Sequence, residues 1–200
     1  MNKLKTILSV LLMMVAVLGA KAAESFVDFK QGDWVLNNNG KVSIYVSANE
    51  QRGVMLAAQN LQKDLKAVCG ADVIFTNEAK DATIVIGTTS TTKAYGKQLK
   101  GKTEMFIIEA KDGQLNIVGS DRRGAIYGIY ELSQQIGVSP WYYWADVPIE
   151  KHAELFIREG EYTDGEPAVR YRGLFLNDEA PCLTSWVKNT FGTDYGDHHF

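Results

Sequence analysis

The order in which strand and helix patterns alternate most constrains what this 200-residue chain can fold into. Two segments, 54–68 and 125–136, carry apolar residues at steps of three and four, which is the spacing of a helix with one buried face. Short segments typical of strands come before and between these helices. They are 34–36, 42–46, 73–75, 83–87, 104–110 and 115–119. This order predicts a small α/β domain in which helices pack on a mixed sheet.

Local signals predict where the two helices begin and end. Ser47 and Glu50 form a Ser-x-x-Glu pattern, which predicts a capping box at the start of the first helix. Gly70 is expected to end that helix in the left-handed conformation. The second helix is expected to start after Asp121 and to end at Gly137.

Two of the strand segments carry a specific structural signal. Residues 83–87 are apolar on both faces, as in a central buried strand. Asp112-Gly113 lies between 104–110 and 115–119, and this dipeptide indicates a tight hairpin.

The chain is expected to contain a second, incomplete domain. The first domain is expected over 23–157, and the polar residues 158–168, with Gly160, Gly165 and Pro167, predict a linker. Residues 169–176 then form a new strand pattern within the last segment, 169–200. Because a lone strand does not fold by itself, it either joins the first sheet or pairs with sequence beyond this chain.

The N-terminus predicts export. Lys3 and Lys5 precede an apolar run over 7–18, and small residues at Ala20 and Ala22 fit a signal-peptidase site. The run is too short to span a bilayer comfortably. We therefore expect a signal peptide over 1–22, a secreted or periplasmic protein, and no stable membrane anchor after cleavage.

Composition and motif spacing exclude several kinds of partner. The 21 basic and 24 acidic residues are nearly balanced and form no basic stripe, so no nucleic-acid partner is expected. The two cysteines, Cys69 and Cys182, could pair in an exported protein but do not make a disulfide framework. Neither a Cys-x-x-Cys nor a paired-histidine spacing accompanies them, and we expect no metal and no cofactor.

The most suggestive candidate site is Asn177-Asp178-Glu179, at the C-terminal tip of the predicted strand 169–176. Barrel enzymes and open α/β sheets place ligand-contacting residues at such tips. Adjacent strand residues point to opposite faces, so Asp178 and Glu179 cannot both flank one bond as acid and base. The alternative, which the pattern alone favours, is an Asx-turn leading into a helix at Pro181.

The aromatic segment 141–144 has two interpretations as well. Trp141, Tyr142, Tyr143 and Trp144 could form a platform on which sugar rings stack. Packing in the core or between domains is the favoured interpretation, because aromatic side chains bury large areas.

Three stretches resemble glycoside hydrolase family 115. Residues 120–133 and 136–148 resemble its N-terminal domain, and 171–181 resembles the start of its barrel. Trp186 and the turn 189–192 continue the match. A weaker similarity of fold extends to the N-terminal domains of family 67 glucuronidases and family 20 hexosaminidases.

This resemblance implies an N-terminal α/β domain followed by the first strand of a truncated TIM-type (β/α)₈ barrel. It implies a glycoside hydrolase, an inverting α-glucuronidase that removes glucuronic acid, or its 4-O-methyl ether, from glucuronoxylan or xylo-oligosaccharides. Its catalytic carboxylates lie on later barrel strands, so this chain is expected to hold no catalytic residue and to be inactive alone. Asp178 is the first choice for a substrate contact, followed by Asn177 and Glu179, and the full-length protein is expected to be a homodimer.

Two other functions stay open. One is a non-catalytic carbohydrate-binding module that uses 141–144 as its platform. The other is a hexosaminidase-like glycosidase, which would need an Asp-Glu pair on a later strand.

Overall fold

The structure is a computed structural model that describes residues 25–173 and 188–189, without the side chains of 143 and 144. The chain divides into two compact units, residues 1–167 and 168–200. The predicted signal peptide over 1–22 and the candidate residues Asn177, Asp178 and Glu179 lie outside the described residues.

The first unit contains nine strands and four α-helices within its described residues. The strands are β1 (Val27–Asp28), β2 (Trp34–Val35), β3 (Lys41–Val46), β4 (Asp72–Phe75), β5 (Ile84–Thr88), β6 (Phe106–Lys111), β7 (Gln114–Gly119), β8 (Phe156–Ile157) and β9 (Gly160–Tyr162). The α-helices are α2 (Arg52–Cys69), α3 (Gly96–Leu99), α4 (Arg122–Gln135) and α5 (Tyr142–Ala145), with short 3-10 turns at Asn38–Gly40 and Ala79–Asp81.

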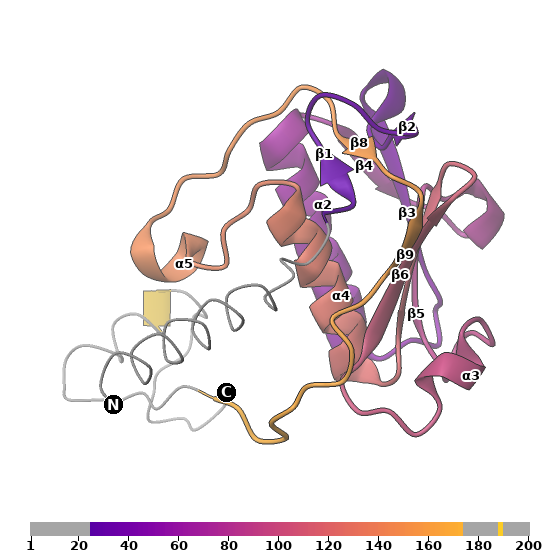
Figure 1. Ribbon diagram of the computed structural model, residues 1–200. Coiled ribbons are helices and arrows are strands. Elements are labelled where there is room, and N and C mark those ends of the chain that lie inside the picture. Colours follow the sequence, from indigo (N-terminus) through magenta and orange to yellow (C-terminus); the bar gives the residue numbers. More distant parts are fainter. Residues whose placement is uncertain (1–24, 174–187, 190–200) are drawn as a thin grey trace, which may run out of the picture. The chain divides into compact units, whose positions relative to one another are not determined.

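The main sheet is mixed, as the sequence predicts. Its six strands run in the order β4-β3-β5-β7-β6-β9, and the smaller sheet has the order β1-β8-β2. Neighbours from β4 to β7 are parallel, whereas β6 pairs antiparallel with both β7 and β9. Helices α2 and α4 lie side by side on one face of the main sheet (Figure 1).

The prediction that residues 83–87 form a central buried strand is confirmed by β5. Ile84 and Ile86 of β5 are fully or almost fully buried in the main core, which lies between the sheet and helices α2 and α4. A second, smaller cluster lies on the opposite face, where Leu99 of α3 packs with Ile107 and Val118. Strand alternation explains the division, because successive residues of β6 and β7 point to opposite faces.

Three of the predicted turns and helix ends are confirmed. Asp112 and Gly113 both have positive φ, 51° and 77°, as a tight hairpin of this type requires. Gly70 caps α2 with φ of 69°. The Asp121 side chain accepts a hydrogen bond from the Gly124 amide at 2.9 Å and so caps α4.

The predicted capping box is wrong. Helix α2 begins at Arg52 with Gln51 as its N-cap, and no side chain caps it. Ser47 and Glu50 instead form a turn before the helix, in which the Glu50 amide donates to the Ser47 carbonyl at 2.9 Å. The Glu50 carboxylate instead accepts hydrogen bonds from Thr88 and Thr91, at the end of β5 and in the loop after it. A local sequence pattern does not reveal these distant partners.

Two predictions around the end of the first domain are corrected. Strand β9 pairs with β6 within the stretch 158–168, so the sheet continues past Ile157 into the predicted linker. The glycines in this stretch favoured a loop prediction. A strand at the edge of a sheet can nevertheless form there, because it pairs with a single neighbour, here β6. The strand predicted over 169–176 is absent from its described part, 169–173, which pairs with no described strand. Residues 174–176 lie outside the described residues.

Glycines bring α4 unusually close to the sheet. A Cβ atom at Gly124 would lie 2.2 Å from the carbonyl oxygen of Met105. A Cβ atom at Gly128, one turn later, would lie 2.8 Å from Ile117 Cγ2. At Gly119, the last residue of β7, a Cβ atom would lie 2.0 Å from the Ala125 amide nitrogen. A larger residue at Gly124 or Gly119 would have to move backbone atoms, whereas one at Gly128 would have to displace the side chains of Ile117 and Phe106.

We predict that Gly124→Ala destabilises the chain by about 1–3 kcal/mol, because the backbone oxygen of Met105 cannot give way without moving the helix. Gly53→Ala in α2 is the matched control. Its Cβ would meet only side-chain atoms of Arg122 and Ile126 at 3.4 Å, and alanine favours the helix by about 0.5–1 kcal/mol. Urea denaturation of the two variants measures both effects. Equal stability of Gly124→Ala and the unaltered chain would contradict the close contact.

Candidate functional site

Several of the candidate residues lie outside the described residues. They are Asn177, Asp178 and Glu179, and also Cys182, the possible disulfide partner of Cys69. The Cys69 thiol donates to the Leu65 carbonyl oxygen at 3.1 Å, and burial raises its pKa. Within residues 25–173 and 188–189, no group of three His, Cys, Asp or Glu side chains could hold a metal ion. No helix in the same residues is long and apolar enough to cross a membrane.

The first polar cluster in the described residues lies at the C-terminal ends of β3 and β5. The Glu50 carboxylate accepts hydrogen bonds from the Thr88 amide at 3.0 Å, the Thr88 hydroxyl at 3.0 Å and the Thr91 hydroxyl at 2.6 Å. The Thr88 and Ser90 hydroxyls lie 2.6 Å apart. These groups satisfy one another, so the cluster ties the loop after β5 to the start of α2 and is structural.

A second polar cluster joins the start of α4 to the residues before β6. The Asp121 carboxylate, which caps α4, also accepts from the Glu104 amide at 2.8 Å. Arg123 lies 2.6 Å from the Glu104 carboxylate, which is buried. Charged partners around this loop therefore fix its position against the helix.

The candidate site is a pocket on the outer side of α2 and α4, which we call the tyrosine pocket. Its volume is about 340 Å³. The lining residues come from α2, from α4, from the segment after α4 and from α5: Asn60, Asp64, Tyr127, Tyr130, Glu131, Ser133, Gln134, Val138, Ser139, Pro140 and Tyr142. It lies wholly within the first unit.

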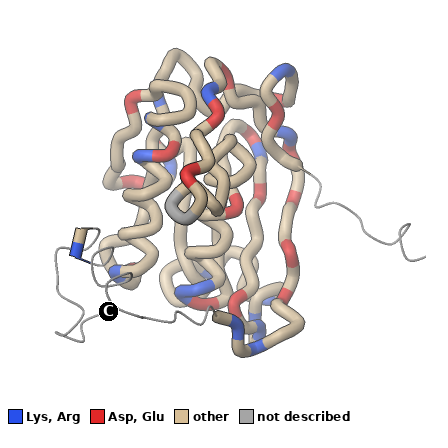
Figure 2. The backbone as a smooth tube through the Cα atoms, turned by 90° about the vertical axis from the view of Figure 1, so that its left-hand side faces the viewer, with Lys and Arg blue, Asp and Glu red and all other residues tan. Residues whose placement is uncertain are grey.

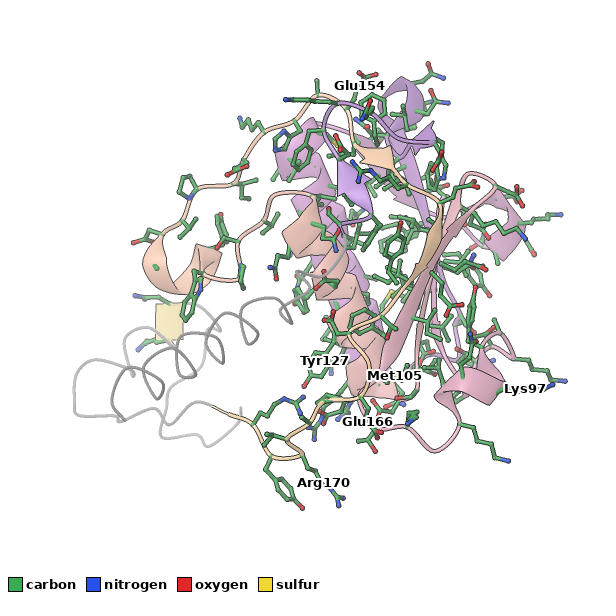
Figure 3. The ribbon with its side chains drawn as sticks, viewed as in Figure 1. Lys97, Met105, Tyr127, Glu154, Glu166 and Arg170 are labelled. Atoms are coloured by element: carbon green, nitrogen blue, oxygen red, sulfur yellow. The ribbon has the colours of Figure 1, made fainter. Side chains whose placement is uncertain are left out.

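The three tyrosines are among the most exposed large side chains of the domain. Tyr127, Tyr130 and Tyr142 are 36%, 44% and 38% exposed. Tyr127 extends from α4 on the side away from the sheet (Figure 3). Residues Ala125, Ile129 and Leu132 fill the core from the opposite side of the helix, so the tyrosine rings are not needed to close it.

Polar groups of the tyrosine pocket are arranged on α2 beside these rings. The Asn60 side-chain amide donates to the Tyr130 hydroxyl at 2.9 Å, which fixes the position of that ring. Asp64, one turn further along α2, is half-buried, and desolvation by burial raises the pKa of its carboxyl group. The nearby Ser133 hydroxyl and Lys63 act on that pKa in the opposite direction.

Charge in the tyrosine pocket has one sign. Its ionisable carboxyl groups are Asp64 and Glu131, and no lysine or arginine is among the described residues that line it. Elsewhere, basic and acidic residues are interleaved along the described backbone (Figure 2). The residues that line the pocket therefore carry acidic groups only, and the nearby cation that acts on Asp64 is Lys63, outside the lining.

Trp141 lies beside the tyrosine pocket and is not part of the core. It is 60% exposed, so it does not pack in the core of the first unit, and packing between domains stays a prediction. Tyr142 lines the pocket. A segment that favours burial by composition thus presents at least two rings at the surface of the first unit.

The sequence did not predict the tyrosine pocket. Its residues come from positions 60–64, 127–134 and 138–142, which only the packing of α2 on α4 brings together. One usable signal exists, because Tyr127 and Tyr130 fall outside the apolar stripe of their helix.

Two family models match the sequence. The model of glycosyl hydrolase family 115 matches residues 164–200. The model of the N-terminus of glycosyl hydrolase family 67 matches residues 34–132. No curated protein matches the chain.

A solved structure from the same family is similar to this chain. A family GH115 4-O-methyl-α-glucuronidase with specificity for decorated arabinogalactans is 33% identical over 83% of this chain, with a TM-score of 0.66. The chain spans 22% of the length of that protein.

Two further structures are more distant. A GH138 enzyme targeting pectin rhamnogalacturonan II is 24% identical over 48% of this chain and 13% of its own, with a TM-score of 0.38. An N-acetyl-β-hexosaminidase of Streptomyces plicatus is 14% identical over 74% of this chain and 26% of its own, with a TM-score of 0.49. Nothing further follows from these two.

The raised pKa of Asp64 leads to a prediction about stability and pH. A carboxyl whose pKa is higher in the folded than in the unfolded chain opposes folding once it ionises, so its contribution falls as pH rises from 3.8 through the folded pKa. Asp64→Asn should therefore raise the melting temperature at pH 7, and the gain should vanish well below pH 3.8. Asp72→Asn, at an exposed position of β4, is the control. A gain that is the same at both pH values would contradict this cause.

Proposed function

We propose that this chain, which is the N-terminal fragment of a glycosyl hydrolase family 115 protein, belongs to a secreted, inverting α-glucuronidase. The observation that carries this proposal is the 33% identity to a GH115 4-O-methyl-α-glucuronidase over 83% of the chain. Export rests on the signal-peptide pattern over 1–22.

The bond to be cleaved joins glucuronic acid, or its 4-O-methyl ether, to a polysaccharide. Glucuronoxylan is the substrate implied by the family resemblance of the sequence. A decorated arabinogalactan is the second candidate, because the similar solved enzyme has that specificity.

Inverting cleavage requires two carboxyl groups with separate roles. It needs a general acid and a general base on opposite sides of the bond, about 6.5–9.5 Å apart, with room for a water molecule. By the family resemblance of the sequence, we assign the general acid and the general base to later strands of the barrel, and we expect the 200-residue chain alone to be inactive.

Asn177, Asp178 and Glu179 are the residues of this chain that we assign to the substrate. They follow the predicted strand 169–176, within the part that matches the family 115 model. Asp178 is the first choice, because a carboxylate there can accept hydrogen bonds from sugar hydroxyls. Asn177 and Glu179 lie next to it.

The full-length protein should release glucuronic acid or its 4-O-methyl ether from glucuronoxylan or from a decorated arabinogalactan, with inverted anomeric configuration by NMR. Asp178→Asn should lower kcat/KM about tenfold or more, the loss expected when a hydrogen bond to a charged group is removed. Asp146→Asn, at an exposed position where φ is 50°, is the control, because asparagine tolerates this conformation.

Two results would contradict the proposal. Failure of the full-length protein to release a uronic acid from either polysaccharide would refute the α-glucuronidase. Release by the 200-residue chain alone would refute the assignment of its catalytic groups to later barrel strands.

A further inference from the structure

We propose that the tyrosine pocket is a binding site for a neutral stretch of polysaccharide, separate from the groups that would cleave the glucuronic acid. The class of ligand rests on the proposed function. The position and chemistry of the site rest on the described residues alone.

The first argument is the arrangement of the rings. Tyr127 and Tyr130 lie on the outward side of α4, and Tyr142 adds a third ring from α5. Sugar rings carry apolar C–H faces, which pack on exposed aromatic rings in water. A pocket of about 340 Å³ with aromatic walls and a few polar groups has the character of a small-molecule site, for which about 300–1,000 Å³ is typical.

The second argument is the supply of hydrogen-bonding groups at the edges of the rings. The Asn60 side-chain NH₂ group donates one hydrogen bond to the Tyr130 hydroxyl, and the amide oxygen of Asn60 can accept one. Gln134 and Ser139 line the same space and can donate or accept. Hydroxyl groups of a sugar both donate and accept, so this mixed set suits them.

The third argument is charge, which selects neutral sugars over uronic acids. Asp64 and Glu131 contribute carboxyl groups, and no basic residue is among the described residues of the lining. A glucuronic acid carboxylate would be repelled by these two groups and would find no cationic partner among the described residues that line the pocket. Neutral galactose, arabinose or xylose units avoid that repulsion. The pocket is therefore suited to the undecorated chain and not to the sugar that is removed.

Such a site would strengthen binding of the polymer without touching the bond that is cleaved. A second contact on the same polypeptide raises the effective concentration of the polysaccharide near the catalytic domain. It would favour long chains over short fragments, because only a long chain could reach both sites.

Calorimetric titration of the full-length protein with xylohexaose, and separately with a neutral galacto-oligosaccharide, tests the proposal and distinguishes the two sources of ligand. Tyr130→Ala should weaken binding of the favoured oligosaccharide about three- to tenfold, the loss expected for one aromatic contact. Tyr130→Phe keeps the ring and should restore affinity to within about twofold. Leu56→Ala, an exposed position of α2 outside the pocket, is the matched control and should change nothing.

Three results would overturn the proposal. They are no binding of either oligosaccharide, equal losses for Tyr130→Ala and Leu56→Ala, and a lower melting temperature for Tyr130→Ala with unchanged affinity. The last would show that the rest of the polypeptide covers the pocket. Since binding is measured without cleavage, a protein that binds but releases no uronic acid refutes only the α-glucuronidase. One that cleaves but binds independently of Tyr130 refutes only the pocket.

Discussion

The close contact between helix α4 and the sheet is the constraint on which the rest of the domain depends. Gly124 and Gly128 lie one turn apart on the helix, and each meets an atom of β6, β7 or the residue before β6 where a side chain would not fit. Gly119 makes the same approach from the end of β7. These three glycines therefore determine how closely α4 approaches the sheet, and the side chains of the main core fill the remaining space between them.

That contact also determines what the outside of the helix presents. When Gly128 faces the sheet, Tyr127 and Tyr130 must face outward, since they lie one position before and two positions after it. The Asp121 cap and the buried Glu104 beside Arg123 fix the start of the helix, and with it the direction in which the first turn faces. Neighbouring α2 then supplies Asn60 and Asp64 at the same height. The tyrosine pocket is thus a consequence of how α4 packs.

Sequence reasoning succeeded where the signal is local and periodic. The apolar spacing of α2 and α4, the Asp112-Gly113 hairpin and the Gly70 cap each follow from a few neighbouring residues. It failed where a distant partner competes with a local pattern. Glu50 satisfies a capping-box pattern, yet Thr88 and Thr91 offer its carboxylate more hydrogen bonds.

Edges and sites were harder to predict for a related reason. Strand β9 is three residues long and borders glycine-rich sequence, so only its pairing with β6 reveals it. The tyrosine pocket combines three separate stretches, none of which forms a motif. Asn177, Asp178 and Glu179 could be singled out because they follow a strand pattern, and their role stays a prediction.

The N-terminal fragment of this family 115 protein therefore has a closed core of its own, and its described residues hold structural polar clusters and a surface pocket. Hydrogen exchange of the 200-residue chain tests the central claim, that the α4–sheet contact holds the domain together. Amides of α4, β6 and β7 should exchange slowest, with the free energy of global unfolding, whereas those of the short strands β1 and β2 should exchange through smaller openings. Faster exchange at Ala125 and Ile129 than in β1 and β2 would contradict it.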